Sequence, residues 1–187
     1  MPGLRKLLDW VLTLAIAIGF VLVFEAEVAK PYRIPSSSME PTLHCAKPAA
    51  WCEAEFSDRV IVNRLAYRFS GPARGEIVVF SAPAAAKNDC GEGGTYVKRL
   101  LGLPGDIVSE RHGVISINGK RLSENYAMGT KQDPTTGTWH VPNGKYFLVG
   151  DDRPHSCDSR TWGSVPRSSL IGPLLLTYWP LNRLSFH

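Results

Sequence analysis

The sequence of 187 residues has no long run of one charge, because its 21 Lys and Arg residues and 17 Asp and Glu residues are scattered. A protein that follows a phosphate backbone needs clustered positive charge, so nucleic acid is not an expected partner. Charged residues make up only 20% of the chain and hydrophobic residues 44%, which excludes both disorder and several membrane spans. The length suits one domain with a short appendage.

Long hydrophobic runs are also scarce, and the one near the N-terminus extends over fifteen uncharged residues from Trp10 to Phe24. As a helix this run covers roughly 23 Å of a hydrocarbon core about 30 Å thick. With Arg5 and Lys6 in the cytoplasmic headgroups, we predict a transmembrane anchor helix in residues 1–30 and a cytoplasmic N-terminus. A cleaved secretory signal is the alternative, and it would export the same remainder of the chain.

Residues 31–187 are predicted to form one β-rich domain. Pro31 and Pro35 favour extended backbone before them, so the N-terminal helix should end before Lys30. Short runs rich in Val, Ile, Tyr and Phe then recur between turn residues, which is typical of strands. These runs are Arg59–Asn63, Glu76–Phe80, Tyr96–Leu101, Ile107–Ser109, Val114–Ile117, Tyr146–Val149 and Leu174–Trp179.

The turns indicate the type of sheet. Asn118–Gly119 separates two apolar runs and predicts a two-residue hairpin. No fixed-period repeat is present, and Gly and Pro recur in the connections. We therefore predict a mainly β fold with coiled antiparallel sheets in an irregular, barrel-like domain. Residues 82–95 and 123–140 are predicted to be surface loops.

Three segments carry candidate chemistry, and the first lies at Ile34–Leu43. It places three serines between two prolines, and a serine presented from such a stiff turn could be a nucleophile beside groups that face an oxyanion. Taken alone, the segment fits a Ser-rich linker better.

The second segment contains Lys98, which shares a strand face with Tyr96 and Leu100 if Thr95–Asp106 begins as a strand. A lysine acts as a general base only when neutral, and at a pKa near 10.4 fewer than about one in a thousand is neutral at pH 7. Burial among apolar neighbours could lower that pKa by roughly three units. A single surface lysine is the ordinary alternative.

The third segment, Gly150–Gly163, is dense in charged and hydroxyl groups. Asp158 and Arg160 could form a structural ion pair, and Ser156 could orient a nearby amine. A solvated turn explains the composition equally well.

In this order, the segments resemble the conserved boxes of the type I signal peptidases, serine proteases with a Ser–Lys dyad. The resemblance covers nearly the whole chain. It lies in Ser36–Leu43, Asp58–Arg64, Lys98–Asp106 and Gly150–Arg160. It implies a membrane-bound endopeptidase that removes signal peptides after small-x-small motifs such as Ala-x-Ala.

The resemblance also implies roles for individual residues. Ser38 would be the nucleophile, Lys98 the general base, and Ser36 a donor to the oxyanion beside the Ser38 N–H. Ser156 would orient Lys98, and Asp158 and Arg160 would brace the site. The residues expected to line small apolar substrate pockets are Tyr32, Ile34, Met39, Tyr96 and Val97.

Further expectations concern partners and place. The substrates would be secretory preproteins, whose signal peptides bind as an added β-strand. No metal or organic cofactor is implied. We expect a monomer in the lipid bilayer of a cell (plasma) membrane, as a single-pass protein with an extracytoplasmic catalytic domain.

The chain departs from the family pattern at Asp152 and His155, where asparagines are common, and in the segment 44–55, which resembles an insertion. Four cysteines stand at 45, 52, 90 and 157, and disulfides are permitted outside the cytoplasm. Three pairings are possible, and we favour Cys45–Cys52 with Cys90–Cys157. Zinc is a poor alternative because no Cys-x-x-Cys is present.

Rival functions fit less well. A self-cleaving repressor uses the same chemistry but carries a DNA-binding helix pair, which does not suit an apolar and then extended N-terminus. A Ser–His–Asp hydrolase could use His155, yet the sequence has no Gly-x-Ser-x-Gly elbow. A scaffold that binds signal peptides without cutting them is the rival outside the enzymes.

Overall fold

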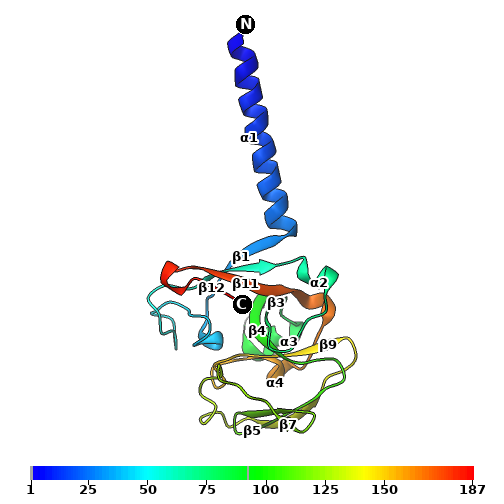
Figure 1. Cartoon of the computed structure of the whole chain (residues 1–187). Coiled ribbons are helices and arrows are strands. Elements are labelled where there is room, and N and C mark those ends of the chain that lie inside the picture. The colour runs from blue at the N-terminus through cyan, green and yellow to red at the C-terminus, as the bar shows by residue number, and fades with distance from the viewer. Residues whose placement is uncertain (1, 92) are drawn as a thin grey trace.

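The structure is a computed structural model that describes residues 2–91 and 93–187, and it consists of a long helix followed by a β domain (Figure 1). Helix α1 (Pro2–Glu27) projects away from the domain and leads into strand β1 (Ala29–Arg33). The helix therefore ends before Lys30, as the prolines predict.

The membrane-spanning character predicted for the N-terminal helix is not confirmed. Among the residues that the structure describes, no helix is both long and apolar enough to cross a membrane.

A large antiparallel sheet forms the body of the domain and curls into a half-barrel (Figure 1). Its strands follow the order β1-β2-β11-β3-β4-β9-β10, and β12 pairs with β11. Register shifts interrupt β11 and β4, and such irregularities bend a sheet. The remaining strands of this sheet are β2 (Arg59–Asn63), β3 (Ile77–Ser81), β4 (Thr95–Gly102), β9 (Lys145–Val149), β10 (Val165–Pro166), β11 (Leu170–Trp179) and β12 (Ser185–Phe186).

A smaller antiparallel sheet lies at the end of the domain away from α1, with the order β7-β6-β5-β8 (Figure 1). Asn118 and Gly119 have positive φ angles of 52° and 79°, so the predicted hairpin joins two of its strands. The strands are β5 (Ile107–Arg111), β6 (Val114–Ile117), β7 (Lys120–Arg121) and β8 (Thr136–His140). The mainly β, antiparallel fold class is thus confirmed.

Two predicted loops contain regular structure, which corrects the sequence analysis. The segment 82–95 holds helix α3 (Ala84–Cys90), and the segment 123–140 ends in β8, which pairs with β5. The other short elements are α2 (Ala66–Phe69), α4 (Ser159–Trp162), and the 3-10 turns η1 (Ser37–Met39), η2 (Arg167–Ser169) and η3 (Leu181–Arg183).

The buried apolar side chains form three clusters, and the site region lies where two of them meet. Ile34 and Met39 belong to one cluster, against which Tyr32 and Val97 pack. A second contains Phe80 and Leu100, against which Tyr96 packs. Neighbouring residues of β4 therefore anchor in different clusters, because successive side chains of a strand point to opposite faces.

Candidate active site

A cleft of about 320 Å³ opens between β1, η1 and the first half of β4. The predicted nucleophile Ser38, the predicted base Lys98 and the supporting Ser36 all line it. So do the five residues predicted to form apolar pockets, which are Tyr32, Ile34, Met39, Tyr96 and Val97. His155 and Cys157 complete its wall, so three stretches of the chain that lie far apart in the sequence reach one cavity.

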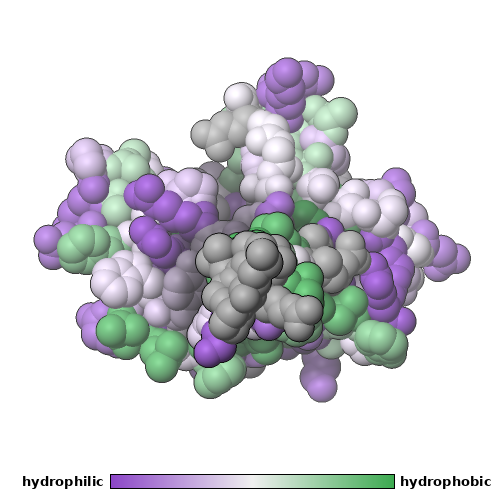
Figure 2. Space-filling model, turned by 90° about the horizontal axis from the view of Figure 1, so that it is seen from above, coloured by the Kyte–Doolittle hydropathy of each residue, from purple (hydrophilic) through white to green (hydrophobic). Residues whose placement is uncertain are grey.

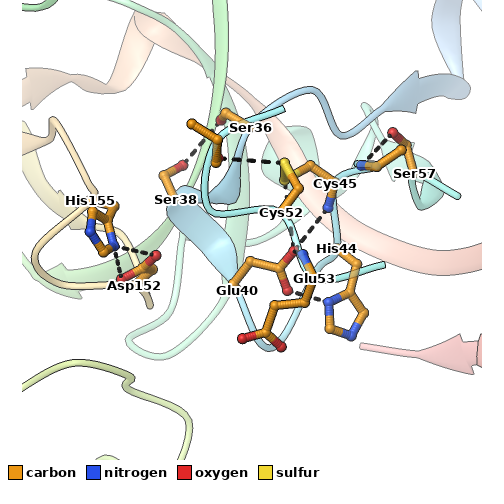
Figure 3. Close-up of a disulfide and its surroundings, with 12 residues drawn as sticks. Ser36, Ser38, Glu40, His44, Cys45, Cys52, Glu53, Ser57, Asp152 and His155 are labelled. Atoms are coloured by element: carbon orange, nitrogen blue, oxygen red, sulfur yellow. Dashed lines mark hydrogen bonds and ion pairs between the residues drawn. A yellow bond between two sulfur atoms is a disulfide. The ribbon is translucent and has the colours of Figure 1, made fainter. Parts of the chain in front are cut away.

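Ser38 lies in the middle of the η1 turn and is 9% exposed. Its hydroxyl oxygen is 3.5 Å from the hydroxyl oxygen of Ser36 (Figure 3). The backbone N–H of Asp152 donates to the carbonyl oxygen of Ser38 at 3.2 Å. The turn is thereby tied to the segment that follows β9, and the serine is held at the cleft surface.

Lys98 is almost fully buried on β4, with 3% of its surface exposed. Its Nζ lies 5.9 Å from the centre of the Tyr96 ring, as expected for side chains on one face of a strand. Burial lowers the pKa of Lys98 to about 8, although the Asp158 carboxylate acts in the opposite direction. A fraction of the Lys98 amine is therefore neutral near physiological pH.

Asp158 is the centre of a buried polar network rather than part of a solvated turn. Its carboxylate accepts from Arg160 Nε at 2.8 Å, from the Ser156 hydroxyl at 2.6 Å and from the Gly150 N–H at 3.0 Å. Burial raises the pKa of Asp158, but Arg160 and these donors outweigh it and bring the pKa below its usual value. Because Arg160 compensates the carboxylate, Asp158 holds Lys98 less strongly in its charged form.

The Ser156 hydroxyl donates to the Asp158 carboxylate at 2.6 Å. The role predicted for Ser156, orienting Lys98, stays a prediction. The predicted Asp158–Arg160 ion pair is confirmed.

Gly150 is a residue of the site that sequence reasoning did not single out. A Cβ atom there would lie 2.1 Å from the Ser156 hydroxyl oxygen and 2.5 Å from the Ser38 carbonyl oxygen. Only glycine lets the two segments approach this closely. Its place at the start of the charged Gly150–Gly163 segment was the available signal.

Asp151 and Arg99 form a second buried ion pair that the sequence analysis missed. Arg99 Nε and Nη2 donate to the Asp151 carboxylate at 2.8 and 2.6 Å, and the Thr42 hydroxyl donates to it at 2.6 Å. The pair joins β4 to the end of β9 and to the chain just after η1. It therefore fixes the strand that carries Lys98 relative to the turn that carries Ser38.

Both favoured disulfides are present, Cys45–Cys52 and Cys90–Cys157. Their Cα–Cα distances of 5.1 and 6.1 Å lie in the usual range. The first closes the insertion beside the site, and the second joins the end of α3 to the residue after Ser156.

One group in the described part of the chain has ligand types suited to a metal ion, with atoms of Glu40, His44 and Glu53 within 4.8 Å of one another. The Glu40 carboxylate is already engaged, because it pairs with His44 and accepts from the N–H groups of Cys45 and Glu53 at 3.2 and 3.3 Å (Figure 3). We interpret the group as a hydrogen-bonded cluster that holds the two ends of the segment 44–55 together.

A β domain that gathers a serine, a second hydroxyl and a buried lysine in one cleft has the side chains of a serine endopeptidase site. Comparison with known proteins agrees with this class. The family profile of signal peptidases, peptidase S26, matches residues 7–179. The chain therefore belongs to the signal peptidase family, peptidase S26, which confirms the resemblance seen in the sequence.

Individual relatives cover almost the whole chain. A signal peptidase I from Leptolyngbya laminosa is 36% identical over 95% of this chain and 82% of its own length. A signal peptidase IB from Staphylococcus aureus (strain MRSA252) is 32% identical over 98% of this chain and 95% of its own length. A crystal structure of a signal peptidase I from Enterococcus faecalis V583 overlays with a TM-score of 0.46, at 35% identity over 56% of this chain and 97% of that one.

Proposed function

We propose that the chain is an endopeptidase that removes signal peptides from exported preproteins after a small-x-small motif such as Ala-x-Ala. Ser38 would form the acyl-enzyme and Lys98 would be the general base. The observation that carries the proposal is the shared cleft of Ser38 and Lys98, together with a lysine pKa of about 8. At that pKa roughly one lysine in ten is neutral at pH 7.

The proposed reaction needs only these two side chains for proton transfer. Ser38 Oγ attacks the scissile carbonyl carbon while its proton passes to Lys98 Nζ. The resulting ammonium gives that proton to the leaving amine, and an ester to Ser38 remains. Lys98, neutral again, takes a proton from the attacking water and returns it to Ser38 Oγ as the carboxylic acid product leaves, and that acid then loses its proton to solvent.

The developing oxyanion requires preorganised donors. The Ser36 hydroxyl, 3.5 Å from Ser38 Oγ, and the Ser38 N–H are the donors we assign to it. Ser156, Asp158 and Arg160 would support the base, because Ser156 and Arg160 donate to the Asp158 carboxylate and the charge of Arg160 opposes the effect of Asp158 on the pKa of Lys98.

The strand geometry supports binding of the signal peptide as an added strand. β1 is an edge strand, and the pairing of β4 with β9 begins only at Arg99, beyond Lys98. An extended peptide could therefore lie between the end of β1 and the start of β4. Its small side chains would enter the pockets formed by Tyr32, Ile34, Met39, Tyr96 and Val97.

We also propose that the enzyme acts as a monomer at a cell membrane, with the domain on the exported side. Two disulfides support an oxidising compartment. Apolar side chains of α1 are widely exposed, including Trp10 at 76% and Phe20 at 69%. Figure 2, which looks down on the domain from the side of α1, shows further apolar side chains on the surrounding face.

Cleavage of a preprotein with Ala-x-Ala at its junction tests the activity. Ser38→Ala and Lys98→Ala should each lower kcat/KM by at least about a thousandfold, because each removes one half of the nucleophile and base pair. Lys98→Arg should fail as well, since guanidinium does not deprotonate. Lys145→Ala, which changes an exposed lysine on β9, is the matched control.

The same assay separates the enzyme from a scaffold that only holds signal peptides. Intact preprotein after incubation with the wild type, or full activity of either alanine variant, would contradict the proposed function.

A further inference from the structure

A second pocket of about 320 Å³ adjoins the catalytic cleft, and His155 belongs to the walls of both. The insertion 44–55 contributes more than half of its lining. The residues around it are Lys47, Trp51, Cys52, Glu53, Met128, Asp152 and His155. The two pockets therefore lie next to each other at His155.

Trp51 is the most unusual residue of this pocket. It has a φ of 64°, in the left-handed region that residues other than glycine rarely adopt, and yet 65% of its surface is exposed. Its indole stacks on the His155 ring, with ring centres 4.1 Å apart and planes inclined by 17°. Burial in a core does not account for holding a large aromatic side chain in this backbone conformation, and such outliers gather at binding sites.

The loop that carries Trp51 is fixed from two sides. The Cys45–Cys52 disulfide closes it, and the Glu40 carboxylate accepts from backbone N–H groups at both of its ends, Cys45 and Glu53. The indole is thus presented on a rigid support, which reduces the entropy lost when it binds a partner.

His155 offers a directed hydrogen-bond acceptor beside Trp51. Its Nδ1 lies 3.0 Å from both carboxylate oxygens of Asp152. A carboxylate only accepts, so Nδ1 carries the proton of the neutral ring and Nε2 keeps its lone pair. Asp152 is in turn joined through its N–H to the Ser38 carbonyl oxygen, which links this pair directly to the nucleophile turn.

We propose that the second pocket binds the part of the substrate that follows the cleaved bond, and that Trp51 and His155 select for it. The proposal rests on the proposed function. If the signal peptide fills the apolar pockets of the cleft, the chain beyond the cut must leave Ser38 on another side. In Figure 3 Ser38 lies between Ser36 and the His155–Asp152 pair, so this side leads to His155. The Trp51 indole stacks on that His155 ring.

The side chains of the pocket determine which substrate segment it binds. A backbone N–H of the extended segment donates to His155 Nε2, and an apolar or aromatic side chain near the start of the mature protein packs on the exposed face of Trp51.

Two peptide substrates test the inference. Both carry the same sequence up to the cut, but one ends at the first residue after it, while the other continues through several residues that include a phenylalanine. The readout is the ratio of kcat/KM for the long peptide to that for the short one. We expect about tenfold for the wild type, from one aromatic contact and one hydrogen bond.

Substitutions test which residue produces that ratio of kcat/KM values. Trp51→Ala should lower it to about threefold, because the hydrogen bond to His155 remains, whereas Trp51→Phe should keep most of it, because phenylalanine preserves an aromatic face. Phe56→Ala should leave the ratio as in the wild type, since Phe56 is a comparably exposed aromatic residue that lines neither pocket.

The outcomes separate the two proposals. A wild-type ratio near one, or an unchanged ratio in Trp51→Ala, would overturn the subsite while the protease activity stands. Cleavage of neither peptide by the wild type would overturn the proposed function and the subsite with it.

Discussion

At the residue scale, Lys98 is an ionisable side chain in a buried position. Burial lowers its pKa from 10.5 to about 8, which means that the ammonium form is destabilised in the folded state. Such a difference corresponds to about 3 kcal/mol between the folded and unfolded chains at pH values below 8. The buried amine of Lys98 therefore lowers the stability of the fold.

Replacing Lys98 by an apolar side chain of similar length should recover that free energy. We expect Lys98→Met to raise the free energy of unfolding at pH 7 by up to about 3 kcal/mol. Between about pH 8 and 10.5 the unfolded wild type binds more protons than the folded one, so wild-type stability rises with pH and the gain shrinks.

Urea unfolding of both proteins at pH 7 and at high pH measures this difference. Lys145→Met, at an exposed position of β9, serves as the control and should change stability little at either pH. Equal stability of Lys98→Met and the wild type at pH 7 would show that the lysine is not strained by burial.

At the element scale, α1 and the nearby end of the domain share an exposed apolar character. Leu14 and Ile18 on the helix are 62% and 51% exposed, and Leu181 and Phe186 on the domain are 72% and 79% exposed. Scattered apolar residues are normal on a surface, but a helix lined with them outside the domain needs a partner. A membrane surface is the partner we propose.

Charges on α1 should therefore release the protein from lipid. We expect Leu14→Asp combined with Ile18→Asp to weaken binding of the full chain to lipid vesicles by more than about a hundredfold, since burying each apolar side chain contributes roughly 1.5–3 kcal/mol. Vesicle flotation measures the bound fraction. Ile107→Ser, on β5 at the opposite end of the domain, should float like the wild type, and flotation of the charged variant would exclude α1 as the attachment.

At the scale of the whole molecule, the mainly β fold could be predicted because its strands are rich in β-branched and aromatic residues between turn residues. Strand β8 escaped prediction because Thr136–His140 holds only one large apolar residue, Trp139, and owes its conformation to pairing with β5. Helix α3 had a usable signal, since an alanine run lies between Pro83 and Gly91, whose φ is 73°.

The candidate site could be predicted only as far as local motifs reach. The order of the boxes singled out Ser38 and Lys98 as candidates, and both line one cleft in the structure. The roles of Gly150, Asp151 and Trp51 depend on contacts between segments far apart in the chain, and no spacing along the sequence encodes those contacts. These contacts exist only in the folded structure.

The pH dependence of kcat/KM for preprotein cleavage tests the central claim most directly, because it reports the protonation of the free enzyme's base. If neutral Lys98 is that base, kcat/KM should rise tenfold per pH unit below pH 8 and level off above it, following the Lys98 pKa of about 8. A profile that is flat between pH 6 and 9, or one that still rises beyond pH 10 as for an exposed lysine, would contradict the account.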